Sequence, residues 1–84
     1  MAEMHSILST GERRVAALLA EGHDVQTIAE KRGQSVEATE KAVDRVREKT
    51  GRAFATLLES PFTADLAADL SENEQERLRD ALEG

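Results

Sequence analysis

Seven cationic side chains lie close together in the middle of the chain, between residues 31 and 52. Lysine and arginine bind phosphate groups through charge-assisted hydrogen bonds, and arginine can also read the edge of guanine with two parallel bonds. The chemistry that this cluster offers is therefore contact with nucleic acid. A competing interpretation pairs the same side chains with Glu40, Asp44 and Glu48 along one helix, which leaves no binding surface. The seven residues are Lys31, Arg32, Lys41, Arg45, Arg47, Lys49 and Arg52.

No other group of residues points to catalysis or to a metal site. His5 and His23 stand alone, and the chain has no cysteine, so it has no thiolate ligand or thiol nucleophile. The serines lack a neighbouring histidine and are placed to cap helices or form turns. Glu72, Glu74 and Glu76 lack the glycine-containing loop of a calcium site. We expect no enzymatic activity, no cofactor and no metal.

The net charge of −6 is unevenly distributed along the 84 residues. Residues 1–60 carry 9 basic and 10 acidic side chains, whereas residues 61–84 carry 2 basic and 7 acidic ones. The sequence therefore divides into a nearly neutral module, residues 1–60, and an acidic tail, residues 61–84. Because contact with phosphate normally requires a basic surface, this acidity also keeps a protein partner open as an alternative to DNA.

The apolar stretches are short. None approaches the roughly 20 residues that a membrane-spanning helix requires, and no basic-then-apolar signal peptide opens the chain. The sequence thus predicts a soluble, cytoplasmic protein with no membrane partner.

Helix signals begin early in the chain. Ser9 and Glu12 form a capping-box pattern that predicts a helix over about Thr10–Glu21, with apolar residues at helical spacing. Asp24 is placed to cap a second, short helix that ends at Gly33. These two helices and a tight polar turn lead into the third.

A third and a fourth helix are predicted to complete the module. Ser35 caps the third helix, and Gly51 is expected to end it. The fourth helix is predicted over Arg52 to Leu58, closed by Ser60 and Pro61 because proline cannot continue the hydrogen-bond ladder. The inward stripe of the third helix is expected at Val36, Thr39, Val43, Val46 and Thr50.

The tail is expected to hold one or two short helices. Thr63 is placed to cap the first, which carries Leu66 and Leu70, and Ser71 with Glu74 makes a second capping box. The predicted fold class is therefore all-α: a small helical bundle with four core helices and one or two short C-terminal helices.

The order of these features resembles the LuxR/GerE-type helix-turn-helix domain of prokaryotic regulators. The resemblance covers about 50 of the 84 residues, opens on the segment LSTGERRVAALLAEG and needs no gaps. The residues that carry it are Leu8, Glu12, Val15, Leu18, Leu19, Ala20, Glu21, Gly22, Ile28, Ala29, Glu30, Ser35, Val43, Val46, Lys49 and Gly51.

This resemblance implies that the second and third helices form a helix-turn-helix whose third helix enters the major groove of DNA. It places Glu40, Lys41 and Asp44 at positions that face DNA, and the fourth helix at a dimer contact. The predicted DNA-binding residues are Gln26, Thr27, Lys41, Arg45, Arg47, Lys49 and Arg52. The predicted dimerisation residues are Phe54, Leu57, Leu58, Leu66 and Leu70.

Two functional hypotheses follow. The first is a small, dimeric regulator of transcription that binds double-stranded DNA with its third helix as the recognition helix. The second is an acidic interaction module derived from the same scaffold, which binds a regulator or an RNA polymerase subunit instead of DNA. Salt dependence separates them, since DNA binding through phosphate contacts weakens steeply as salt rises.

Overall fold

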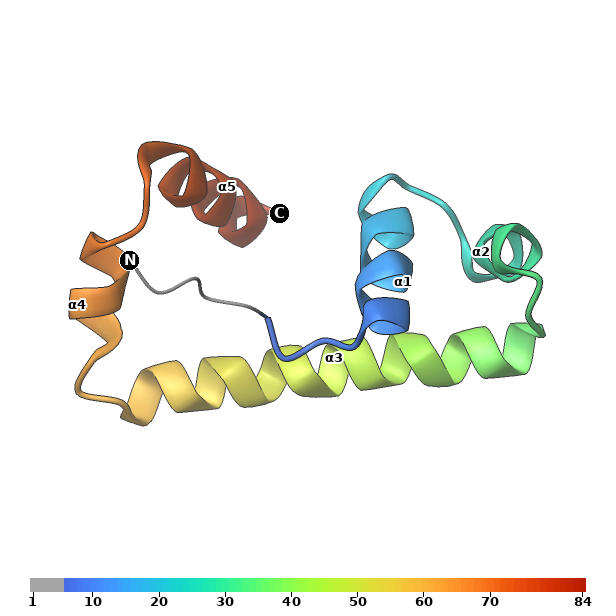
Figure 1. Ribbon diagram of the computed structural model, residues 1–84, viewed down its shortest axis with the longest axis horizontal. Helices are drawn as coiled ribbons and strands as arrows, with labels where there is room; N and C mark the ends of the chain where they lie inside the picture. Colours follow the sequence, from blue (N-terminus) through green and yellow to red (C-terminus); the bar gives the residue numbers. More distant parts are fainter. Residues whose placement is uncertain (1–5) are drawn as a thin grey trace. The chain divides into compact units, whose positions relative to one another are not determined.

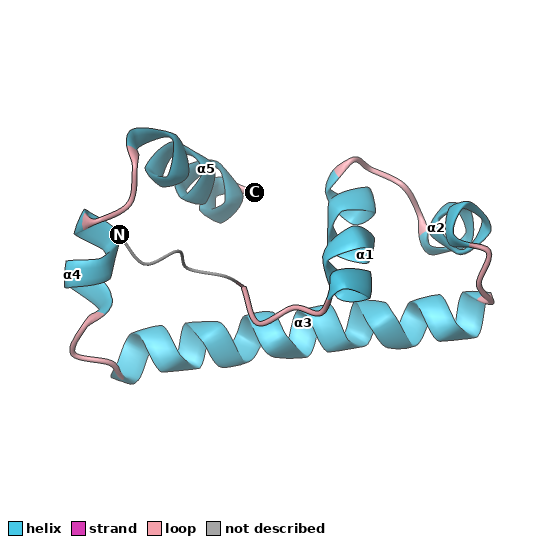
Figure 2. Ribbon diagram, viewed as in Figure 1, coloured by secondary structure: helices cyan, strands magenta, loops and turns pink. Residues whose placement is uncertain are grey.

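The computed structural model describes residues 6–84, and every regular element among them is a helix (Figure 2). This part of the chain forms α1 (Thr10–Ala20), α2 (Val25–Arg32), α3 (Val36–Glu59), α4 (Thr63–Ala68) and α5 (Glu72–Glu83). The all-helical prediction is confirmed. The chain divides into two compact units, Met1–Ala53 and Phe54–Gly84.

The first unit encloses a small core between its helices, with α1 and α2 on one side of α3 (Figure 1). Val15, Ile28 and Thr39 have 0% of their surface exposed, and Ala29 has 3%. The hydroxyl of Thr39 donates a hydrogen bond to the carbonyl oxygen of Ser35 at 2.9 Å. Thr39 therefore takes a core position without leaving a buried polar group unsatisfied.

The predicted caps of the first two helices are confirmed. The backbone N–H of Ser9 donates to Glu12 Oε1 at 2.9 Å, and the N–H of Glu12 donates to Ser9 Oγ at 3.2 Å. The N–H of Thr27 donates to Asp24 Oδ1 at 2.8 Å. These bonds satisfy amide groups that the first turn of a helix otherwise leaves without partners.

The predicted end of the third helix at Gly51 is wrong, because α3 continues through this residue to Glu59. A separate helix over residues 52–58 therefore does not form, and the module has three helices instead of four. Gly51 is not among the glycines with positive φ, so it does not provide a left-handed stop. A glycine inside a helix costs only about 1 kcal/mol relative to alanine, and Arg52 pairs with Glu48 across it at 2.6 Å.

Gly51→Ala is expected to stabilise the chain by about 1 kcal/mol, because alanine is the better helix former. Apart from the backbone of its own helix and its two chain neighbours, nothing lies within 4 Å of the position of the added Cβ. Gly33→Ala is expected to destabilise by about 1–2 kcal/mol, because Gly33 has a left-handed φ of 62°. Urea unfolding followed by circular dichroism measures both. Equal effects of the two substitutions would contradict the helical position of Gly51.

The second unit contains the end of α3 together with α4 and α5, and none of its residues is buried. The predicted capping box at the start of α5 is confirmed: Ser71 N–H donates to Glu74 Oε1 at 3.0 Å, and Glu74 N–H donates to Ser71 Oγ at 3.1 Å. No helix within residues 6–84 combines the length and apolar character needed to cross a membrane.

The predicted capping role of Thr63 is wrong. Phe62 occupies the N-cap position of α4 and makes no side-chain capping bond. The Thr63 hydroxyl instead donates to the carbonyl oxygen of Leu57 at 2.6 Å, so it satisfies a free carbonyl at the C-terminus of α3. Leu70 lies beyond the end of α4 at Ala68, outside the helix that was expected to contain it.

Candidate nucleic-acid interface

The basic residues of α3 lie on two different sides of the helix. Arg45 and Arg47 are two positions apart, which corresponds to a rotation of about 200° around the axis. Arg45 lies on the side that carries Ala38 and Ala42, seven and three positions before it. Arg47 shares the opposite side with acidic neighbours three and seven positions before it, Asp44 and Glu40. The predicted DNA-binding residues of α3 therefore do not form one surface.

Lys49 is engaged inside the first unit. Its Nζ donates to Glu12 Oε1 at 2.6 Å and to the carbonyl oxygen of Ile7 at 3.3 Å. The side chain of Lys49 is 29% exposed and that of Glu12 is 9% exposed. The ammonium group thus links α3 to the first turn of α1, and a phosphate would have to displace a well-packed carboxylate to reach it.

Two other cations of α3 form ion pairs along the helix. Lys41 lies 3.8 Å from Glu37, and Arg52 lies 2.6 Å from Glu48. All four side chains are at least half exposed, and exposed pairs at this spacing contribute little to stability because water and salt screen them. The Arg52–Glu48 pair fits the competing interpretation of the cluster, whereas Lys41 pairs with Glu37, which that interpretation did not name. Both pairs are weak enough for a phosphate to replace the carboxylate.

The N-terminus of α2 already carries a negative group. The Asp24 carboxylate accepts a hydrogen bond from the backbone N–H of Thr27, and this bond holds the pKa of Asp24 below its usual value. The amide of Thr27 is therefore occupied, and the positive end of the helix dipole is compensated by the carboxylate. Gln26 is exposed in the first turn of the same helix.

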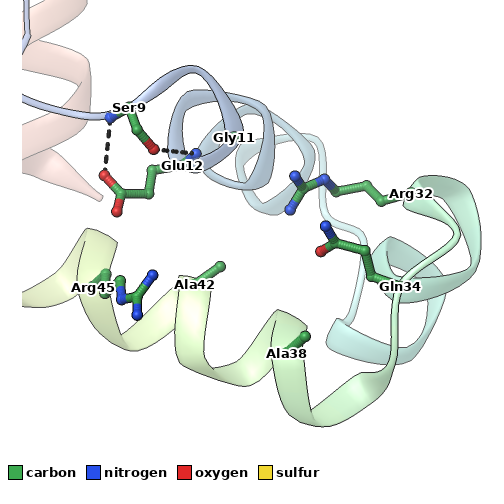
Figure 3. Close-up of a pocket in the computed structure, with 8 residues that line it drawn as sticks. All are labelled: Ser9, Gly11, Glu12, Arg32, Gln34, Ala38, Ala42 and Arg45. Atoms are coloured by element: carbon green, nitrogen blue, oxygen red, sulfur yellow. Dashed lines mark hydrogen bonds between the residues drawn. The ribbon is translucent and has the colours of Figure 1, made fainter.

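An open pocket of about 270 Å³ lies between the three helices of the first unit (Figure 3). The side chains of Arg32 and Gln34 lie next to each other on the side of α2. A Cβ added at Gly11 would lie 3.1 Å from Arg32 Nη2, so the guanidinium packs closely against the first turn of α1. The pocket is lined by Ser9, Gly11, Glu12, Arg32, Gln34, Ala38, Ala42 and Arg45.

This pocket was missed from the sequence because its lining comes from three separate segments. The sequence places Arg32 and Arg45 in one basic cluster but carries no signal that both face the first turn of α1. Gln34 was assigned only to a polar turn. The nearest signal in the sequence was the position of the polar Arg32, one helical turn after the apolar Ile28 and Ala29.

Acid is expected to destabilise the first unit. The Lys49 ammonium and the Ser9 N–H both donate to Glu12, and they hold the pKa of this carboxyl below its usual value. Because the unfolded chain keeps the usual value, the stabilisation is complete above about pH 5 and is lost as the pH falls through the lower pKa of the folded state. Urea unfolding at pH 7 and pH 3 measures the loss.

Glu12→Gln should flatten this pH dependence, because glutamine does not titrate. Asp24 and Glu74 also have lowered pKa values, because of hydrogen bonds with Thr27 and Ser71. These two carboxyl groups account for the pH dependence of stability that remains in the variant. An unchanged pH profile in the Glu12→Gln variant would contradict the role assigned to the pair.

The two histidines were not predicted to bind a metal. His23 lies 3.5 Å from Glu21, and His5 lies outside the described residues. Within residues 6–84 no three side chains of histidine, cysteine, aspartate or glutamate are grouped so that they could hold a metal ion.

The predicted dimerisation residues belong to the second unit. Phe54, Leu57 and Leu66 are about half exposed, and Leu58 is 87% exposed. Leu70 is partly buried. The chain therefore leaves large apolar side chains in contact with solvent along α3 and α4.

The elements that match the expected helix-turn-helix are α2, the turn at Gly33 and α3, with Lys41 and Arg45 exposed on α3. The resemblance to the LuxR/GerE type stays a prediction that depends on these residues and their order. No protein-family model, no curated protein and no solved structure matches the chain.

Proposed function

We propose that this chain is a helix-turn-helix regulator of transcription that binds double-stranded DNA through α3. The observation that supports this best is the exposed side of α3 with Lys41 and Arg45, on a helix that follows α2 after a left-handed turn. An α-helix fits the width of the major groove, where base edges can be read.

In the proposed complex, Arg45 contacts a phosphate or a guanine edge, and Lys41 leaves Glu37 to contact a phosphate. Arg52 contributes from the same side of the helix, seven positions beyond Arg45. Gln26 contacts the phosphate backbone of the DNA from the first turn of α2. We leave Lys49 out of the contact set, because its ammonium is held by Glu12.

Binding of a labelled duplex, followed by fluorescence anisotropy over a range of salt concentrations, tests the proposal. Two or three phosphate contacts predict that the logarithm of the affinity falls against the logarithm of the salt concentration with a slope of about −2 to −3. Genomic fragments serve as a mixed probe, since the operator is unknown. Absence of binding even at low salt would exclude DNA as the partner.

A second candidate function is binding of a protein, such as a regulator or an RNA polymerase subunit. The observation that favours it is the combination of a net charge of −6 with exposed apolar side chains in Phe54–Gly84. Apolar side chains rimmed by charge are typical of surfaces that bind other proteins. Retention of an RNA polymerase subunit on the immobilised chain, with no binding of DNA at low salt, would select this function.

For a DNA-binding chain we propose that the second unit pairs with a second copy of itself. No residue of Phe54–Gly84 is buried, so the helices of this unit do not cover their apolar side chains by packing on each other. A two-fold axis places the same apolar set on both sides of an interface and matches two half-sites on DNA.

Leu58→Lys is expected to convert a dimer into a monomer, because it buries a charge in the proposed interface. The substitution should not unfold the single chain, since Leu58 is 87% exposed there. Analytical ultracentrifugation measures the mass. Asn73→Lys, at an exposed position of α5, is the control and should leave the mass unchanged. A wild-type chain that sediments as a monomer would overturn the proposed dimer.

A further inference from the structure

The pocket between α1, α2 and α3 is lined by two arginine side chains that have no ion-pair partner within the described residues. Arg32 enters it from the end of α2 and Arg45 from α3 (Figure 3). Among residues 6–84, neither guanidinium group makes an ion pair or a hydrogen bond, although the chain has 17 acidic side chains. Two guanidinium groups that line one pocket without counter-ions both attract an anion placed between them.

The carboxylate in the pocket wall does not cancel this charge. Glu12 is 7% exposed and is already paired with Lys49 at 2.6 Å. With Glu12 neutralised by Lys49, Arg32 and Arg45 leave a local charge of about two positive units in a protein of net charge −6. The pocket is therefore an electropositive spot on an acidic chain.

The first turn of α1 brings one further donor to the same place. Gly11 lines the pocket, and the missing side chain lets the Arg32 guanidinium approach the start of this 11-residue helix. The capping box uses the N–H groups of Ser9 and Glu12, whereas the N–H of Gly11 makes no hydrogen bond within the described residues and can donate to an anion. The amide of Gln34 lies beside Arg32 and adds a side-chain donor.

From this arrangement we propose that the pocket binds a phosphate-type oxyanion between Arg32 and Arg45. Arginine binds such groups through paired, charge-assisted hydrogen bonds, and a volume of about 270 Å³ accommodates one phosphate group with its hydration water. The group is either a free phosphate ion or a phosphodiester of DNA. The proposal does not depend on DNA binding, because the site is complete without it.

A titration of the ¹⁵N-labelled full chain with sodium phosphate at constant ionic strength tests this inference by NMR. Saturable shifts are expected for the backbone amide of Gly11, the side-chain amide of Gln34 and the Nε–H of Arg32. Arg32→Met should weaken phosphate binding at least about tenfold, since it removes one of two charged partners. Arg45→Met, at an exposed position, should do the same without affecting folding.

Arg47→Met is the matched control, because it removes a cation from α3 that does not line the pocket. It should retain phosphate binding. Shifts that do not saturate, or that persist unchanged in both the Arg32→Met and Arg45→Met variants, would overturn the site. Adding duplex DNA then separates the two sources: displacement of phosphate supports a DNA phosphodiester at the site, and simultaneous binding supports a free anion.

Discussion

Arg45→Glu is expected to lower the affinity for duplex DNA roughly tenfold or more at low salt, and to reduce the salt slope by about 1. Arg45 is exposed on α3 and makes no ion pair within the described residues, so its guanidinium is ready to contact phosphate or a base edge. Reversing its charge removes one attraction and adds a repulsion. Fluorescence anisotropy at several salt concentrations measures both quantities.

Arg47→Glu provides the comparison, with the same change of charge on the same helix. Arg47 lies on the side that carries Glu40 and Asp44, whose carboxylates already repel phosphate, so the expected loss of affinity is much smaller. Circular dichroism should show unchanged helix content in both variants. Equal losses in the two variants would contradict the assignment of the binding side of α3.

Lys49→Met is expected to lower the melting temperature of the chain by roughly 5–10 °C. Methionine fills the space of the lysine stem, but Glu12 then keeps its low exposure of 7% without the ammonium at 2.6 Å. A carboxylate in such a place destabilises the fold when its partner is removed. Thermal unfolding followed by circular dichroism measures the effect.

Lys41→Met tests whether this effect belongs to the Glu12 pair or to any loss of charge. Lys41 lies 3.8 Å from Glu37 and both side chains are largely exposed, so its removal should leave the melting temperature almost unchanged. In a Glu12→Gln background, Lys49→Met should cost less than in the wild type, because the uncompensated charge is gone. Equal costs in the two backgrounds would show that the pair is not coupled.

The local structure was largely predictable from the sequence. The capping boxes at Ser9 and Ser71 and the caps at Asp24 and Ser35 formed as expected, because each depends on residues three positions apart. The helix end at Gly33 followed in the same way, since only glycine readily adopts the left-handed conformation.

The wrong predictions at Gly51 and Thr63 have a common cause. Gly51 and Thr63 are residues whose types permit two structures, and the local sequence does not choose between them. At Gly51 the helix α3 continues without a break. At Thr63 the hydroxyl donates a hydrogen bond to the carbonyl oxygen of Leu57 and does not cap a helix. Glycine only weakens a helix, and threonine donates to whichever carbonyl lies nearest.

Sequence alone therefore determined the helical class, the caps and the position of a basic cluster, all of which depend on neighbours within about four residues. Only the tertiary structure decided how that cluster is divided. In the folded chain Lys49 pairs with Glu12, which lies 37 positions away in the sequence. Arg45 lines a pocket together with Arg32, and Arg47 lies on another side of α3. Such a division depends on which helices pack together, and the order of charges along the chain does not contain this information.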